Sequence, residues 1–427
     1  MTSCVRPLLV ALCLLVPTSV FAQAVEPVLT RVREERQPFL DTLRELVSIE
    51  SGSSDVEGLN RIADAIAGRL RALGGDVEFV EPPADMVRFE NTPPRTGKSL
   101  VGRFRGTGTK RILLLAHMDT VYPRGMLAKQ PFRIDGDRAY GLGIADDKHG
   151  VALILHTIGV LKALNFTNYG LITVLINGDE EVSSPGSRSL ITSLGSEQDL
   201  VLSCEGVGPA DQIRLTTAGI AAVQLKVTGR ASHAGAAPER GRNALYELAH
   251  QILQTRDLSN PARGVKINWT LANAGSARNV IPAEARATAD VRVLRAADYD
   301  GIERQLRDRM RRQLIPDARV EMTFERTRPP LEATDAARRV ADHAQRIYKE
   351  LGRLLDVQAA APGGGTDAAF AAVATKAAVL EGFGLRGFGA HSNDAEYVEM
   401  ASIDPRLYLL TRMIMDAAQG KAGDTTN

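Results

Sequence analysis

Apolar and polar positions follow two different patterns along this chain. Before residue 219, short and almost wholly apolar runs are separated by longer stretches in which apolar residues recur every three or four positions. The short runs predict strands, at residues 76–80, 99–104, 112–116, 171–176 and 200–204. The longer stretches predict helices, at residues 36–49, 56–73 and 151–164. Because strands alternate with helices, we expect a doubly wound, mostly parallel α/β sheet.

The pattern changes between residues 219 and 326. Strand patterns there alternate apolar and polar residues, as in a sheet with one face open to solvent. They combine with two helical patterns in the βαββαβ order of a ferredoxin-like unit, at residues 221–228, 244–253, 265–272, 285–294, 302–314 and 320–324. We therefore predict an inserted domain at 219–326. It would interrupt one catalytic domain formed by residues 25–218 and 327–420.

The N-terminus predicts export. Arg6 precedes the apolar run from Pro7 to Val16, and small residues follow at Ala22 and Ala24, which is the pattern of a secretory signal peptide over residues 1–24. The alternative, a membrane anchor, requires a longer apolar run. We therefore expect a periplasmic or secreted protein.

Cysteine content and charge narrow the possible functions. Cys204 is the one cysteine left after removal of the signal, which excludes an intrachain disulfide, and we expect a buried thiol there. The formal net charge is +1, which gives no basic field for nucleic acid. No later stretch is long and apolar enough to span a membrane.

At the C-terminus, we expect residues 421–427 to form a frayed tail.

Acidic residues gather where the apolar strands end. The run 171–176 is followed by a turn and then by Asp179, Glu180 and Glu181. Adjacent carboxylates repel one another, so they persist most easily where water solvates them or a cation neutralises them. The motif alone leaves both a solvated loop and a metal site open. Glu205 follows the next strand, and strand ends gather at the functional edge of such sheets.

Histidines beside acidic residues favour the metal site. His117 ends the strand 112–116, and Asp119, two residues on, can accept its second imidazole N–H and fix the tautomer. Two further loops carry Asp146 and His391. The complete mixed set of nitrogen and oxygen ligands suits zinc: His117, Asp146, Glu181, Glu205 and His391.

Two metals are possible if Asp146 bridges them. Each metal then has three protein ligands and an open position, as in sites with metals about 3.5–4 Å apart. Glu180, next to a ligand but facing away from it, is placed to act as the general base.

Several stretches in the same order resemble a two-zinc family of exopeptidases and deacylases. This family includes aminoacylase, acetylornithine deacetylase, succinyl-diaminopimelate desuccinylase and the glutamate carboxypeptidases. The resemblance covers nearly all of the chain after the signal and is strongest for the exported glutamate carboxypeptidases that hydrolyse folates. The matching stretches are LLLAHMDTVY, AYGLGIADDKHG, LINGDEEVSSPGSRSLI, GRASHAGAAPERGRNAL, NVIPAEARATADVRV, GGGTDAA and GFGAHSNDAEYV.

The resemblance implies two Zn²⁺ per subunit and a set of catalytic residues. One zinc would be held by His117, Asp146 and Glu205, and the other by Asp146, Glu181 and His391. The implied catalytic residues are Glu180 as acid/base, Asp119, and His233. His233 lies on the inserted domain, so the resemblance implies a homodimer in which this histidine reaches the partner's site and stabilises the tetrahedral intermediate.

Substrate contacts are also implied. Asn279 and Arg292 match residues that bind the terminal carboxylate of the substrate, and an arginine suits that role by bidentate pairing. Arg328 is a weaker candidate for a side-chain carboxylate. This chain departs from the similar glutamate enzymes at one position, because they have a lysine near the position of Gln212. The difference concerns the preference for glutamate.

We therefore predict an exported two-zinc hydrolase that cleaves the amide bond to a C-terminal amino acid, with glutamate as the first candidate. A first alternative is an N-acyl amino acid deacylase or dipeptidase of the same family. A more remote one is a periplasmic binding protein without turnover, although binding alone does not need a base such as Glu180.

Overall fold

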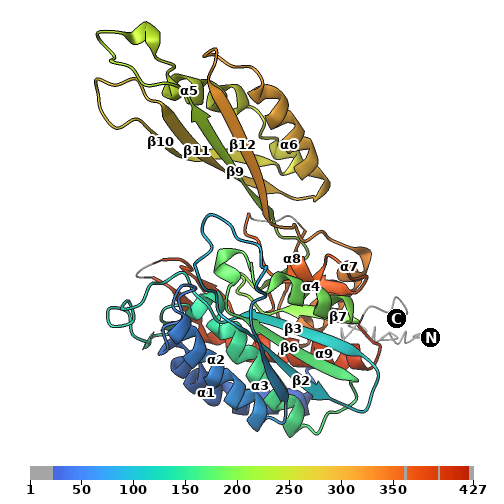
Figure 1. The fold of residues 1–427 in the computed structure, drawn as a ribbon. Helices are drawn as coiled ribbons and strands as arrows, with labels where there is room; N and C mark the ends of the chain where they lie inside the picture. Colours follow the sequence, from blue (N-terminus) through green and yellow to red (C-terminus); the bar gives the residue numbers. More distant parts are fainter. Residues whose placement is uncertain (1–22, 360–362, 393–394, 423–427) are drawn as a thin grey trace, which may run out of the picture.

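A computed structural model describes residues 23–359, 363–392 and 395–422 of the chain. Residues 1–22 of the predicted signal peptide and residues 423–427 of the predicted frayed tail therefore lie outside the described residues. Within the described part, no helix is long and apolar enough to cross a membrane. The chain forms two units, each built around its own sheet (Figure 1).

A six-stranded sheet lies at the centre of the larger unit (Figure 1). Its spatial order is β1 (Asp76–Val80), β2 (Ser99–Arg105), β6 (Leu171–Asn177), β3 (Arg111–His117), β7 (Leu200–Ser203) and β14 (Ala378–Leu380). The β1–β2 and β2–β6 pairs are antiparallel, and the other pairs are parallel. The prediction of a mostly parallel sheet is confirmed.

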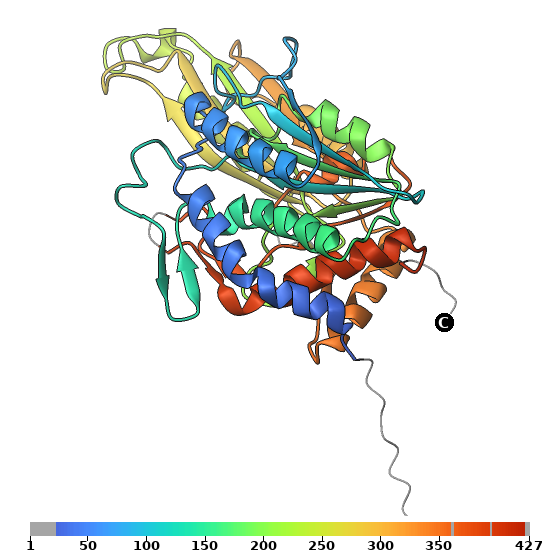
Figure 2. The ribbon, with the colours of Figure 1, turned by 90° about the horizontal axis from the view of Figure 1, so that it is seen from below.

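Helices cover both faces of this sheet. Five pack on one face: α1 (Glu26–Val47), α2 (Val56–Ala72), α3 (His149–Ala163), α7 (Asp335–Glu350) and α9 (Ile403–Ala418). Two pack on the other: α4 (Arg188–Ser196) and α8 (Ala368–Ala371). Along β3, Ile112 and Leu114 join the first core, whereas Leu113 and Leu115 join the second. Figure 2 shows α1, α3 and α9 side by side beneath the sheet.

Local sequence signals explain where several of these elements begin and end. The Asp55 side chain accepts a hydrogen bond from the Gly58 N–H and so caps the start of α2. Gly74 ends the same helix with a φ of 94°, a conformation that favours glycine. Helix α1 begins at Glu26, well before the predicted Arg36, because Val28 and Val32 are also buried in the core.

The smaller unit contains the second sheet. It follows the chain order β9 (Gly219–Thr228), α5 (Ala244–Thr255), β10 (Lys266–Ala274), β11 (Glu284–Val293), α6 (Ala297–Met310) and β12 (Arg319–Arg328). The strands lie in the order β10-β11-β9-β12, all antiparallel, and form a separate core with the two helices. This is the topology of the predicted βαββαβ unit.

The described residues also form six very short strands, and all but one were not predicted; the exception agrees with a short strand that the sequence predicts near Val357. Strands β4 (Arg133–Asp135), β5 (Arg138–Tyr140), β15 (Gly387–Phe388) and β16 (Tyr397–Glu399) form one small sheet, and β8 (Gln212–Arg214) pairs with β13 (Asp356–Gln358). Each has only two or three residues, so its apolar pattern carries little information. Strand β5 pairs with the distant β16, and β8 pairs with the distant β13. These long-range pairings bring the loops of the candidate site together.

The contact between α4 and α8 generates a stability prediction. Gly195 lies in α4, and a Cβ added there would lie 2.5 Å from the carbonyl oxygen of Ala371. Gly195→Ala should therefore force the two helices apart and lower the free energy of unfolding by about 1–3 kcal/mol. Urea unfolding followed by circular dichroism measures this change.

Gly68→Ala is the matched control. Gly68 is exposed within α2, and an added Cβ there meets nothing within 4 Å. Because alanine is the better helix former, this variant should gain up to about 1 kcal/mol of stability. Equal effects at the two glycines would contradict the packing argument.

Candidate metal centre

The carboxyl ends of the parallel strands meet at one edge of the large sheet. His117 is the last residue of β3, Glu180 and Glu181 lie in a short turn after β6, and Glu205 follows β7. Since β3, β6 and β7 run in the same direction, their ends bring these side chains to the same edge. The structure places all four residues at the ends of buried strands, where the sequence predicts them.

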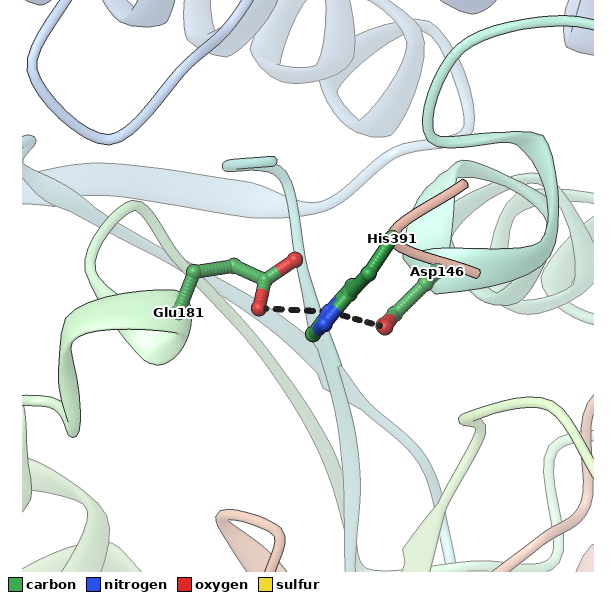
Figure 3. Close-up of side chains that lie close together, drawn as sticks. All are labelled: Asp146, Glu181 and His391. Atoms are coloured by element: carbon green, nitrogen blue, oxygen red, sulfur yellow. Dashed lines mark ion pairs between the residues drawn. The ribbon is translucent and has the colours of Figure 1, made fainter. Parts of the chain in front are cut away.

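Asp146 lies at the centre of the site. Its Oδ1 is 2.9 Å from His117 Nε2, and its Oδ2 is 3.2 Å from His391 Nε2. His391 Nε2 is also 3.1 Å from Glu181 Oε2, so the imidazole lies between two carboxylates (Figure 3). The ligand atoms of Asp146, Glu181 and His391 all lie within 4.8 Å of one another. Four of the five predicted ligands therefore form one connected cluster.

Glu205, the fifth predicted ligand, lines the same cleft as this cluster. No hydrogen bond or ion pair joins its carboxylate to the other four within the described residues. Burial raises its pKa well above the ordinary value, and the nearby carboxylates of Glu381, Glu180 and Asp146 raise it further. Glu205 is therefore close enough to the cluster for its charge to matter.

The charges of the cluster show whether it suits a cation. Burial raises the pKa of Glu181 to about 7, and the charge of Asp146 contributes to this shift. Burial also opposes ionisation of Asp146, but hydrogen bonds from His117 and His391 outweigh it and hold its pKa below the ordinary value. Glu181 Oε1 is buried and has no hydrogen-bond partner among the described residues.

These features fit a bound divalent metal. Carboxylates that share a poorly solvated site disfavour one another's ionised forms, and a cation removes that cost. Imidazole nitrogens and carboxylate oxygens are ligands that zinc accepts. The unpartnered Glu181 oxygen would gain a ligand of opposite charge. The residues present therefore fit the predicted metal.

Asp119 lies behind His117 and organises both glutamates. Its Oδ1 is 3.3 Å from His117 Nδ1 and accepts the N–H of Glu180 at 3.0 Å. Its Oδ2 accepts the N–H of Glu181 at 3.1 Å and the hydroxyl of Ser53 at 2.8 Å. This buried carboxylate thus orients the imidazole and the turn that carries both glutamates, as a second-layer partner of a metal site does.

Glu180 is held by Arg328, which the sequence suggested as a substrate ligand. Arg328 Nη2 is 2.8 Å from Glu180 Oε1 and also donates to its carbonyl oxygen at 2.8 Å. Arg328 Nη1 donates to Asp367 Oδ1 at 2.8 Å. Both terminal nitrogens thus contact protein acceptors, and Arg328 is the ion-pair partner of Glu180 in this structure. Its predicted contact with a substrate carboxylate stays a prediction.

Asp367 extends this network and was missed by the sequence analysis. It accepts hydrogen bonds from Asn177 Nδ2 at 2.7 Å and from the Ser184 hydroxyl. Burial raises the pKa of Glu180 well above its ordinary value, while the charge of Arg328 lowers it and that of Asp367 raises it. The position of Asp367 directly after the glycine run GGGT was the signal in the sequence.

Glu396 also was missed, although it lies in the loop of His391. Its carboxylate accepts hydrogen bonds from the backbone N–H groups of Gly143 at 2.9 Å and Ala145 at 2.7 Å, and from the Tyr122 hydroxyl at 2.6 Å. This one side chain ties the loop of His391 to the loop of Asp146. It therefore fixes the separation of two predicted ligands.

His233 and Asn279 lie apart from the cluster. Both are exposed on adjoining loops of the smaller unit, where the Ala234 N–H donates to the Asn279 carbonyl oxygen at 2.9 Å. His233 Nδ1 accepts the N–H groups of Gly235 and Ala236, each at 3.1 Å. A neutral imidazole held this way carries its proton on Nε2 and presents an N–H donor outward.

A cleft of about 750 Å³ connects the cluster to the smaller unit. Arg292 lines it, pairs with Asp290 Oδ2 at 2.9 Å and donates to the Gly363 carbonyl oxygen at 3.1 Å. Gln212 does not line it; its Nε2 donates to the carbonyl oxygen of Val207. His233 and Asn279 do not line it either, so Arg292 and Arg328 are the predicted residues of the smaller unit that line this cleft.

Comparison with known proteins agrees with this geometry. Residues 113–416 match the model of peptidase family M20/M25/M40. Carboxypeptidase G2 of Pseudomonas sp. (strain RS-16) is 44% identical over 402 residues, which cover 94% of each chain. The name of this relative states carboxypeptidase activity and no substrate. It therefore supports the resemblance to carboxypeptidases, but not the preference for glutamate.

Solved structures share the fold at low sequence identity. Aminopeptidase PepT from Bacillus cereus superposes with a TM-score of 0.72 at 20% identity, over 90% of this chain and 99% of that one. The Bacillus subtilis YXEP protein, described as a dinuclear metal binding peptidase, superposes with a TM-score of 0.64 at 14% identity, over 91% and 99% of the two chains. At these identities the similarity concerns the fold alone.

The cluster around Asp146 predicts stabilisation by zinc. A metal that binds only the folded chain should raise the unfolding temperature, and a hundredfold excess over its dissociation constant adds about 2.7 kcal/mol. Asp146→Asn should lose most of this shift, because its carboxylate contacts both histidines. Thermal unfolding of metal-stripped protein with added zinc measures it.

His250→Ala is the matched control, because it removes a partly buried imidazole that lies outside the cluster. His250 lies on α5 and contacts the carbonyl oxygen of Arg312 at 3.1 Å, far along the chain from the cluster. This variant should keep the full zinc shift. An undiminished shift in Asp146→Asn would show that zinc binds elsewhere.

Proposed function

The chain belongs to peptidase family M20/M25/M40, and on this premise we propose that it is a two-zinc carboxypeptidase. It would hydrolyse the amide bond between an acyl or peptidyl group and a C-terminal amino acid, with glutamate preferred. The observation that carries the proposal is Asp146, whose two carboxylate oxygens face two different histidines. Such a carboxylate is suited to bridge two metals.

Two ligand sets follow from this bridge. His117, Asp146 and Glu205 would hold one zinc, while Glu181 and His391 would complete the other with the second oxygen of Asp146. When bound, the metals would supply Lewis-acid polarisation of the scissile carbonyl and would make water a better nucleophile at neutral pH. Asp119 supports this site because its carboxylate orients the imidazole of His117 from behind.

Glu180 would move the proton. It takes a proton from the attacking water and returns it to the leaving amine. Burial raises its pKa, which suits a group that must be protonated during the second step. Arg328 holds the carboxylate in place through contacts to both its side chain and its backbone.

Arg292 would bind the terminal carboxylate of the substrate. Its guanidinium lines the same cleft as Glu180 and Glu181, which supports this role. A guanidinium matches the fork geometry of a carboxylate. Asp290 pairs with Arg292 and so holds its guanidinium in position before substrate binds. Asn279 would contribute to the same carboxylate from the partner subunit, since it does not line the cleft of its own chain.

A homodimer would complete the site. His233 would reach the partner's cleft and donate its Nε2–H to the negative oxygen of the tetrahedral intermediate. Its exposure and its separation from the cluster of its own chain support action in trans. Strand β10 is an edge of its sheet, and α5 exposes Leu245, Tyr246 and Leu253, so this unit offers a surface for self-association. The signal-like residues 1–24 support a periplasmic or secreted location.

An N-acyl amino acid deacylase or dipeptidase would use the same metal ligands. A binding protein would not need Glu180 and its supporting ion pair with Arg328. Release of free amino acids from a panel of N-acyl amino acids and dipeptides, measured with zinc-loaded protein, separates these functions.

Glu180→Gln tests the proposed reaction. The amide keeps the shape of the side chain but cannot accept the proton, so kcat should fall by about a hundredfold or more. Zinc content should stay at two ions per chain, because Glu180 is not a proposed ligand. Near-normal turnover with both zincs present would rule out its role as base, and one tightly bound zinc in active protein would rule out the metal pair.

Glu90→Gln is the control for this variant. Glu90 lines the same cleft but contacts Gln224 on the smaller unit instead of the metal cluster. It should keep near-normal turnover, so that a loss confined to Glu180→Gln reports on the base and not on removal of one negative charge.

Mixing two inactive variants tests action across the dimer. Glu180→Gln and His233→Ala protein should recover activity after subunit exchange, because one site of each hybrid dimer has both residues intact. Random exchange sets a ceiling of about a quarter of wild-type activity. Glu180→Gln mixed with Asp146→Asn should recover nothing, since each change disables the site of its own chain and leaves no intact site in the hybrid. No recovery in the first mixture, despite demonstrated exchange, would show that His233 acts within its own chain or not at all.

A further inference from the structure

Arg214 is a cation in the cleft that no role described above uses. It ends β8, and its side chain lines the cleft together with Glu180 and Glu205. Its Nη1 donates to the carbonyl oxygen of Gly206 at 3.1 Å, one residue beyond Glu205. Its Nε is buried and has no hydrogen-bond partner among the described residues. A buried guanidinium nitrogen without a partner calls for a ligand or another explanation.

The other guanidinium groups of the cleft already have carboxylate partners. Arg328 contacts Glu180 and Asp367, and Arg292 pairs with Asp290. Within the described residues, Arg214 has no carboxylate oxygen within the 4.0 Å limit of an ion pair. Of the three arginines that line this cleft, it is therefore the one without a carboxylate in direct contact among the described residues, and an incoming anion could fill that place.

A second unpartnered donor lies on the same segment. Thr217 is a lining residue of the cleft, and its hydroxyl is buried and has no hydrogen-bond partner among the described residues. A carboxylate offers about four acceptor sites and can take hydrogen bonds from a guanidinium and a hydroxyl together. The segment from Arg214 to Thr217 thus holds two donors without partners, in residues that line the same cleft as the candidate metal ligand Glu205.

We propose that Arg214, assisted by Thr217, binds the side-chain carboxylate of the substrate's C-terminal residue and makes the enzyme select acidic residues. The inference rests on the proposed carboxypeptidase function. Arg292 on the smaller unit and Arg214 on the larger unit form two separate cationic positions in the cleft. One residue with two carboxylates, such as glutamate, occupies both, whereas a neutral residue leaves Arg214 unpaired.

A purely structural role predicts a different result. Burial raises the pKa of Glu381, and the charge of Arg214 lowers it, so Arg214 also balances an internal carboxylate. If this were its whole function, its loss would damage the metal site and slow every substrate equally. A side-chain subsite instead changes the ratio between acidic and neutral substrates.

The test is kcat/KM for one N-acyl group joined to glutamate, glutamine or leucine, measured with zinc-loaded wild type, Arg214→Gln and Arg214→Lys. Arg214→Gln should lose about ten- to a hundredfold on the glutamate substrate, the value of a hydrogen-bonded charge pair. It should change little on glutamine and leucine. Arg214→Lys should keep part of the preference, because it keeps the charge.

Gln212→Ala is the matched control. Gln212 lies on the same strand, two residues before Arg214, but donates to Val207 and does not line the cleft. It should leave the ratio of glutamate to glutamine turnover unchanged. Zinc content and unfolding temperature of each variant check that the metal site and fold are intact.

Three results would overturn the subsite. The first is a wild type that cleaves glutamine as well as glutamate, which decides the question even if Arg214→Gln does not fold. The second is an equal loss on all three substrates. The third is an Arg214→Gln variant that loses equally on N-acyl-glutamate and N-acyl-glutamine and no longer distinguishes N-acyl-glutamine from its C-terminal α-amide. That result would place Arg214 on the terminal carboxylate of the substrate. Failure to cleave any N-acyl amino acid would instead reject the proposed function itself.

Discussion

Carboxylates crowded at one edge of a largely apolar sheet are the constraint on which the site depends. Asp146, Glu180, Glu181 and Glu205 lie close enough to disfavour one another's ionisation, and burial raises the pKa of the three glutamates. Only counter-charges make such an arrangement stable. Imidazoles on both oxygens of Asp146 supply part of the compensation. A pair of divalent cations would supply the rest, so metal binding and the order of this edge should be coupled.

The rest of the larger unit holds these charges in register. Parallel β3, β6 and β7 bring their ends to one edge, and the buried carboxylate of Asp119 then orients His117 together with the turn of Glu180 and Glu181. Glu396 joins two loops that are far apart in sequence. Each supporting contact uses a buried, hydrogen-bonded carboxylate, which is rigid because its alternatives would leave polar groups unpaired. The site is thus positioned by polar contacts set on an apolar scaffold.

The two units divide the chemistry between them. Groups that would hold metals and move protons come from the larger unit, whereas Arg292 faces the same cleft from the smaller one. His233 and Asn279 are exposed and do not line that cleft. A second copy would account for their position. On this view the smaller unit contributes to its own cleft through its sheet and to a neighbouring cleft through its loops.

The sequence by itself determined the α/β class, the βαββαβ order of the smaller unit and the set of candidate ligands. These depend on local patterns: apolar runs specify buried strands, and parallel strand ends converge wherever the sheet forms. Arg328 shows what sequence could not decide, since its pairing with Glu180 joins residues 148 positions apart. The same holds for Arg214, which lines the cleft at the end of the three-residue β8, a strand that pairs with the distant β13. Side-chain direction and charge partner depend on contacts between remote segments, and a local pattern carries no information about them.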